Sequence, residues 1–167
     1  MSKIDLEFTV GDHVVYPAHG VGSIAGVETQ EVAGLSLEVY VITFDHEKMT
    51  LRVPTRKAKT AGLRAMAGGT VVTQALTTLK GRARVKRTMW SRRAQEYEAK
   101  INSGDLISIA EVVRDLHRAD NQPEQYYSER QLYESALDRM AREVAAIEQI
   151  DRDAAIGILN KSLQKAA

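Results

Sequence analysis

The sequence contains no cysteine, which excludes disulfide bonds, thiol nucleophiles and thiolate metal ligands. Aromatic residues make up only 5% of the 167 residues, so hydrophobic cores must be mainly aliphatic. No apolar run approaches the length of a membrane-spanning helix, and the first residues lack the apolar segment of a secretion signal. We therefore expect a soluble, cytoplasmic protein with one domain or two small ones.

Acidic residues are also absent from a long central stretch. Residues 1–47 hold eight acidic residues and one basic residue, whereas residues 48–95 hold thirteen basic residues and no acid. Residues 96–167 hold fourteen acidic and nine basic residues, although the whole chain has a net charge of only +1. Such segregation suggests a polyanionic partner, and the surface of an acidic protein would suit it as well.

The first third of the chain has the pattern of short β-strands. Segments rich in β-branched and aromatic residues are separated by glycine or proline turns, which is typical of strands. These segments span residues 10–16, 21–29, 37–45 and 49–53. Four or five short strands within roughly sixty residues predict a small β barrel of the Tudor or SH3 type.

Helical periodicity begins near residue 70 and continues towards the end of the chain. Apolar residues recur at spacings of three and four in segments that start near Val71, Ser91, Asp105, Ser128 and Asp151. Ser91, Asp105 (or Ser103) and Asp151 are suited to cap the helices that follow them. The pattern predicts an α+β protein with two domains, a β barrel over 1–68 and a compact bundle of four to five helices over 69–167.

The sequence shows no pattern typical of a catalytic or metal centre. The four histidines lack metal-ligand spacing, and no GxSxG or Walker motif occurs. Residues 20–26 resemble a dinucleotide fingerprint, but they have one residue too many before the last glycine and precede strand-like sequence. We expect no enzymatic activity, no cofactor and no metal, with a small nucleic-acid-modifying enzyme as an alternative.

A basic segment near the start of the helical part is the strongest electrostatic signal. Within fourteen residues it contains Lys80, Arg82, Arg84, Lys86, Arg87, Arg92 and Arg93, and no acid. Cations of this density bind nucleic-acid phosphates by releasing condensed counterions. A solvated linker and helix surface is the alternative interpretation of the same residues.

Trp90 lies beside this segment and is the only tryptophan in the chain. A single tryptophan more often belongs to a core than to a binding site. Trp90, however, lies among charges at a predicted helix start, where a core-facing stripe is hard to draw. Minor-groove binders use apolar residues flanked by arginine to unstack base steps. We therefore interpret Trp90 as a wedge that contacts distorted DNA.

Four motifs occur together in the chain. They are VGDHVVYPAHGVG at 10–22, TLRVP at 50–54, WSRR at 90–93 and GDLISIAEVVRDLHR at 104–118. In this order and spacing they resemble the bacterial CarD/CdnL family of transcription regulators, and the CdnL proteins most closely. The resemblance spans most of the chain. One departure is Gln30, which stands where some members have a basic residue.

The resemblance implies a Tudor-like domain, residues 1–68, that binds the β subunit of RNA polymerase. It also implies a helical domain, residues 69–167, that binds promoter DNA at the upstream edge of the melted region. Such proteins stabilise the open complex, notably at ribosomal RNA promoters. By position, the polymerase-binding residues would be Val39, Arg52 and Pro54. The DNA-binding residues would be Lys86, Arg87, Trp90, Arg92 and Arg93.

Further expectations concern partners. We expect a monomer associated with the nucleoid, with RNA polymerase and promoter DNA as partners and no membrane contact. The main alternative is an adaptor that docks on polymerase or another protein without touching DNA. Ala166 and Ala167 at the C-terminus resemble the tags that AAA+ proteases such as ClpXP recognise, and a frayed helix end is the alternative there.

Overall fold

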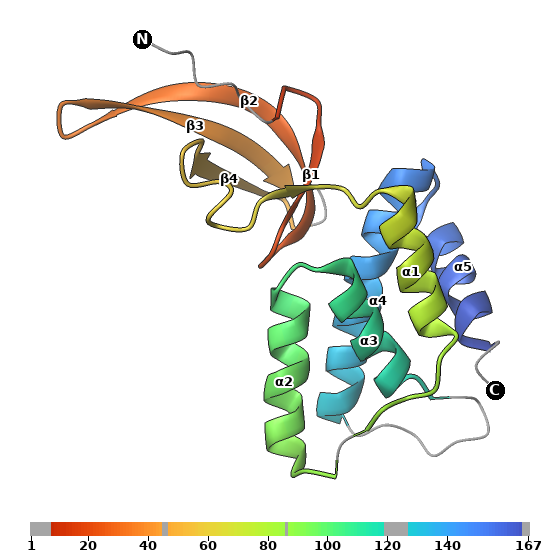
Figure 1. Cartoon of the computed structure of the whole chain (residues 1–167). Helices are drawn as coiled ribbons and strands as arrows, with labels where there is room; N and C mark the ends of the chain where they lie inside the picture. Colours follow the sequence, from red (N-terminus) through yellow and green to blue (C-terminus); the bar gives the residue numbers. More distant parts are fainter. Residues whose placement is uncertain (1–7, 45–46, 86, 119–126, 165–167) are drawn as a thin grey trace. The chain divides into compact units, whose positions relative to one another are not determined.

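The structure is a computed structural model of the chain, and it describes residues 8–44, 47–85, 87–118 and 127–164. The chain divides into two compact units, Met1–Met66 and Ala67–Ala167. The strands belong to the first unit and the helices to the second (Figure 1). The expected α+β class, with an antiparallel sheet followed by a helical region, is confirmed.

The β unit is a five-stranded antiparallel sheet with the strand order β4-β3-β2-β1-β5. Its strands are β1 (His13–Tyr16), β2 (Gly20–Val32), β3 (Leu35–Phe44), β4 (Met49–Pro54) and β5 (Arg64–Ala65). The four strands expected from the sequence are present, and β2 and β3 extend beyond the expected ends to form a long hairpin. The two-residue β5 was not located from the sequence, because so short a strand carries no alternating pattern.

One face of the sheet carries the core of the β unit. Phe44 and Ile42 of β3 are fully buried there. Gly22 of β2 lies against them, and a Cβ atom at this position would be 2.8 Å from Cε1 of Phe44. The glycine therefore lets β2 pass close over the phenylalanine ring, and this explains the second glycine of the GVG sequence in physical terms.

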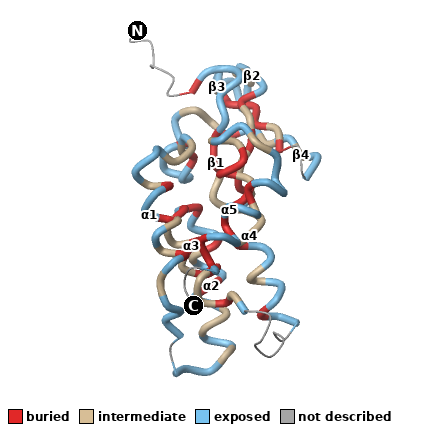
Figure 2. The backbone as a smooth tube through the Cα atoms, turned by 90° about the vertical axis from the view of Figure 1, so that its right-hand side faces the viewer, coloured by how far each residue is buried: buried red, intermediate tan, exposed pale blue. Residues whose placement is uncertain are grey.

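The helical unit has five helices in the described residues. They are α1 (Gly69–Leu79), α2 (Trp90–Asn102), α3 (Leu106–Leu116), α4 (Tyr127–Glu148) and α5 (Arg152–Gln164). Helix α3 packs against α1, α2 and α4, and six of its eleven residues are buried. Within the helical unit, the buried residues coloured in Figure 2 form one core cluster shared by these helices. A helix buried on several sides forms the centre of the bundle.

The predicted helix caps are confirmed at two positions and wrong at one. Oδ2 of Asp105 accepts a hydrogen bond from the backbone N–H of Ser108, and Oδ1 of Asp151 accepts one from Ala154. Ser91 does not cap α2, because the helix begins one residue earlier. There the backbone carbonyl of Met89 accepts from Arg92 and Arg93, at 3.1 Å each.

Candidate nucleic-acid and protein interfaces

The outer edge of β4 is the first candidate interface. β4 ends the strand order, so one of its sides has no strand partner within the part of the chain that the structure describes. In the register with β3, Arg52 pairs with Val41 and Pro54 pairs with Val39. An open strand edge can pair with an extended segment of another protein, with backbone hydrogen bonds supplying the affinity.

Arg52 does not present a free charge at this edge. Its Nε donates to Oε2 of Glu28 on β2 at 3.4 Å, and both side chains are about half exposed. Val39 is buried, with 2% of its surface exposed. The three residues expected to bind polymerase therefore lie close together on neighbouring strands. Only Arg52 and Pro54 offer side-chain surface, whereas Val39 supports the strand beneath them.

The basic segment between α1 and α2 is the second candidate interface. Asp115 of α3 fixes it, because its Oδ1 accepts the backbone N–H of Arg84 at 2.9 Å. The side chain of Arg87 is exposed, and 77% of the surface of Met89 is exposed. Lys86, also expected to bind DNA, lies outside the described residues. Charge and apolar surface are thus presented together just before α2.

Trp90, at the first position of α2, is partly buried rather than surrounded by solvent. Its indole Nε1 donates to Oγ of Ser128 on α4 at 3.0 Å. The indole centroid lies 6.4 Å from that of Tyr97, and the ring packs against the core of the helical unit. The sequence made a core-facing stripe hard to draw at this helix start, but α4 and Tyr97 provide a core-facing position for the indole. The indole is held in a fixed position with part of its surface accessible.

The two arginines that follow Trp90 have different environments. Arg92 is exposed, and no ion pair joins it to any residue that the structure describes. The guanidinium carbon of Arg93 lies 5.1 Å from the centroid of the Trp90 ring, within the range of a cation–π contact. Nε of Arg93 is buried and has no hydrogen-bond partner in the described part of the chain. Trp90 and Arg93 therefore form one unit, with the exposed cation of Arg92 beside it.

Tyr97 adds a neutral polar group behind this unit. Burial raises the pKa of its hydroxyl, the nearby carboxylate of Asp115 raises it further, and the charge of Arg93 opposes the change. The phenol therefore stays protonated at all ordinary pH values. The phenol of Tyr97 therefore adds no charge of its own to the site.

The sequence did not reveal the partners that orient these side chains. Ser128 lies thirty-eight residues from Trp90, and Asp115 lies thirty-one residues from Arg84. Neither residue stands in a motif that indicates these contacts. The exposure of Met89 could have been inferred, because the residue lies outside the apolar stripe of α2. Ala166 and Ala167, the expected protease tag, lie outside the described residues.

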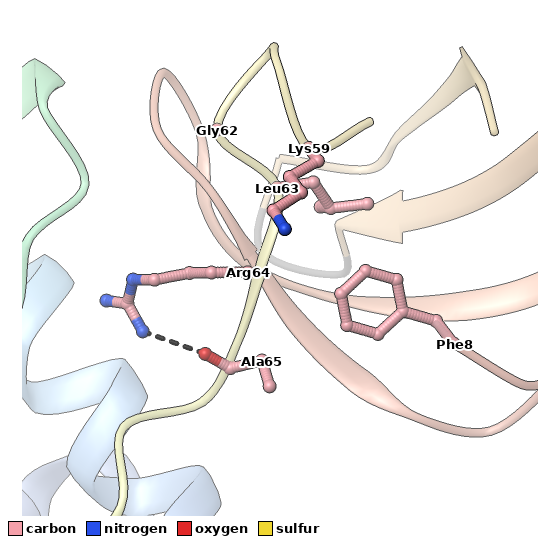
Figure 3. Close-up of a pocket in the computed structure, with 6 residues that line it drawn as sticks. All are labelled: Phe8, Lys59, Gly62, Leu63, Arg64 and Ala65. Atoms are coloured by element: carbon pink, nitrogen blue, oxygen red, sulfur yellow. Dashed lines mark hydrogen bonds between the residues drawn. The ribbon is translucent and has the colours of Figure 1, made fainter. Parts of the chain in front are cut away.

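A cavity of about 500 Å³ opens in the β unit, lined by Phe8, Lys59, Gly62, Leu63, Arg64 and Ala65. In Figure 3 the side chain of Arg64 extends away from the ring of Phe8, and its Nη1 donates to the carbonyl of Ala65 at 3.0 Å. No cluster of three metal-ligating side chains occurs among the residues described. Likewise, within these ranges, no helix is both long and apolar enough to cross a membrane.

Comparison with known proteins gives matches for both units. Residues 8–67 match the CarD-like/TRCF RID domain, and residues 74–160 match the CarD C-terminal domain. A curated relative, named "Putative transcription factor YdeB" from Bacillus subtilis (strain 168), is 28% identical over 143 residues. That alignment covers 86% of this chain and 94% of the relative.

Proposed function

The chain belongs to the CarD family, and we propose that it is a CdnL-like transcription regulator that stabilises the open promoter complex. In this proposal the β unit binds the β subunit of RNA polymerase through the edge of β4. The helical unit binds promoter DNA at the upstream edge of the melted region, for example at ribosomal RNA promoters. The domain that matches residues 8–67 is an RNA polymerase interaction domain, which supports the first contact.

The observation that carries the DNA contact is the arrangement at the start of α2. Four consecutive residues present an accessible part of the Trp90 indole, the guanidinium of Arg93 over its ring and the exposed cation of Arg92. Exposed cations supply sequence-independent affinity for phosphates, and a fixed apolar ring can pack against an unstacked base. In this proposal the cluster contacts phosphates and an unstacked base and does not read base edges. Promoter preference would then arise from DNA shape and deformability.

The mechanism follows from differential affinity. A protein shifts a promoter towards its open state only if it binds that state more tightly than the closed one. A tenfold shift requires about 1.4 kcal/mol, which is within the range of one aromatic contact with a nucleic-acid base. In the proposal the Trp90 indole supplies this difference, whereas the cations bind both states. The β unit keeps the protein on the polymerase between encounters.

The test is the lifetime of open complexes formed by RNA polymerase on a ribosomal RNA promoter. We expect the wild-type protein to prolong the lifetime about tenfold or less, and Trp90→Ala to abolish most of the effect while polymerase binding is kept. Trp90→Phe keeps an aromatic ring at the site and should keep part of the effect. This intermediate variant separates loss of the wedge from loss of the fold, because Trp90 also packs against the core.

A reciprocal variant tests the β unit. Arg52→Ala should weaken binding to polymerase, and its effect on lifetime should recover at high protein concentration because the DNA contact is intact. If wild-type protein leaves the lifetime unchanged, the proposal fails. If Trp90→Ala is as active as wild type, the protein acts as a docking adaptor without the DNA contact.

A further inference from the structure

The acid-free part of the sequence is divided between the two units. Residues 48–66 belong to the β unit and carry six basic residues, and residues 67–95 belong to the helical unit and carry seven. Three of the six lie in the loop between β4 and β5, residues 55–63, which we call the β4–β5 loop. They are Arg56, Lys57 and Lys59. The β unit therefore has a cationic surface of its own.

All three of these cations are exposed on the β unit. No carboxylate forms an ion pair with Arg56, Lys57 or Lys59 within the part of the chain that the structure describes, and all three residues are exposed. Elsewhere the cations are commonly paired: Lys100 lies 2.9 Å from Glu111, and Arg118 lies 3.0 Å from Glu129. An accumulation of like charge without counter-charges repels itself, and an anionic partner would relieve that repulsion.

The loop holds its cations in fixed positions. The backbone N–H of Lys57 donates to Pro54, that of Ala61 donates to Lys57, and that of Leu63 donates to Ala58, at 2.8–3.0 Å. The side chains of Ala58 and Leu63 are buried, with 2% and 4% of their surfaces exposed. Binding a partner would therefore order little of the loop backbone, and this lowers the entropic cost of binding.

Gly62 lets the end of the loop pack closely against the sheet. Its φ of +92° favours glycine, and a Cβ atom there would lie 2.7 Å from Cγ of Pro17. Pro17 directly follows β1, so the loop lies closely against the end of that strand. The cations of the loop are thus part of the rigid β unit.

We propose that the β4–β5 loop binds the phosphate backbone of duplex DNA, which gives the β unit a DNA contact in addition to that at the start of α2. This inference rests on the proposed DNA contact of the helical unit. The loop offers cations and no aromatic side chain, so its contact is with phosphates and independent of sequence. Once one unit is bound, the second contact forms within the same molecule and gains from a high effective concentration.

An acidic protein segment is the rival partner for the same cations. Such a segment would be expected to place an apolar side chain in the neighbouring cavity. Of the three loop cations, however, only Lys59 lines that cavity. Arg56 and Lys57 lie outside it. Cations spread over the surface in this way fit the regularly spaced phosphates of a DNA backbone better than they fit a peptide anchored in the cavity. The charge distribution therefore favours DNA.

The test compares the salt dependence of DNA binding by full-length variants without polymerase. Lys57→Gln/Lys59→Gln removes two loop cations, and Lys48→Gln/Lys161→Gln removes two exposed cations elsewhere, one from each unit. Binding to a short duplex is measured across a salt series. Each lost phosphate contact reduces the slope of log K against log salt by about 0.9. We expect the slope of the loop variant to fall by about 1.8 and that of the control variant to stay near wild type.

Two outcomes overturn the inference. Equal slopes for the loop variant and wild type exclude the phosphate contact. If, in addition, the loop variant binds polymerase more weakly, the loop contacts an acidic protein surface instead. Arg92→Gln, measured in the same series, separates this failure from that of the proposed function. If Arg92→Gln has a shallower slope and the loop variant does not, only the proposed loop contact is wrong. If the slopes of all variants equal that of wild type, the proposed DNA contact of the helical unit is wrong as well.

Discussion

The two candidate interfaces of this chain hold their charges in opposite ways. At the edge of β4, Arg52 is paired with Glu28, and the available groups are those of the backbone. At the start of α2, Arg92 is unpaired in the described part of the chain, and Arg93 is stacked on Trp90. A contact built on backbone pairing depends little on salt, whereas one built on free cations weakens steeply with it. If both proposed contacts form, the chain binds its two partners through different physical forces.

Separate cores underlie the two interfaces. Phe44 is fully buried in the core of the β unit, and Met140 is fully buried in the core of the helical unit. No residue is shared by the two clusters as the structure describes them. Each interface therefore depends on the folding of its own unit.

The largest expected effect comes from breaking one core at a time. Phe44→Ala should cost the β unit about 3–5 kcal/mol, and Met140→Ala should cost the helical unit about 2–5 kcal/mol, because each leaves a cavity in a packed interior. Hydrogen exchange measured on peptides from both units reports each core separately. We expect Phe44→Ala to lower protection in the strands and leave α3 protected, and Met140→Ala to do the reverse.

The two variants serve as controls for each other. Loss of protection throughout the chain in either variant would contradict the independence of the two cores, because it would show that they unfold together. The same variants can be tested for binding to DNA and to polymerase. Met140→Ala should weaken DNA binding while polymerase binding persists, as expected if the interfaces act independently.

A smaller effect is expected at the indole of Trp90. Ser128→Ala removes the acceptor of the Nε1 hydrogen bond and should cost about 1 kcal/mol of unfolding free energy. Trp90 is the only tryptophan, so its fluorescence reports this site alone. We expect emission at longer wavelength in Ser128→Ala, because the indole gains contact with water.

Ser128→Thr is the matched control, since threonine keeps the hydroxyl acceptor. Its emission should match that of wild type. Identical emission from Ser128→Ala and wild type would show that the indole is held by packing against Tyr97 and the core alone. In that case the fixed position of the indole would not depend on the hydrogen bond to Ser128.

The sequence predicted the parts of the fold that arise from local signals. Asp105 and Asp151 cap helices because a carboxylate before an apolar stripe satisfies free backbone N–H groups, and this can be read from neighbouring residues. The start of α2 could not be read in this way, because its N-cap residue, Met89, makes no side-chain capping hydrogen bond. The partial burial of Trp90 depends on Ser128, which is distant in sequence. The roles assigned to the interface residues remain predictions.

The smallest expected effect lies far from both interfaces, at an ion-pair network between α4 and α5. Burial by itself would raise the pKa of Asp138, but hydrogen bonds from Arg142 and Arg152, together with their charges, outweigh it. The pKa of Asp138 is therefore below its ordinary value of 3.8. Because both arginines are partly exposed, solvent screens the interaction and the stabilisation is modest.

The sign of the pH dependence follows from this lowered pKa. A carboxylate that is more acidic in the folded state stabilises the fold fully above its unfolded pKa, and the contribution is lost as the pH falls through the folded value. Asp138→Asn should therefore be less stable than wild type at neutral pH, and the difference should shrink below pH 3.8. Urea denaturation across this range measures it. Asp153→Asn removes a carboxylate that lies 3.6 Å from Nη1 of the same Arg152 but is 94% exposed, so solvent screening should leave little difference at either pH. A difference for Asp138→Asn that persists in acid would mean that hydrogen-bond geometry, and not charge, joins α5 to α4.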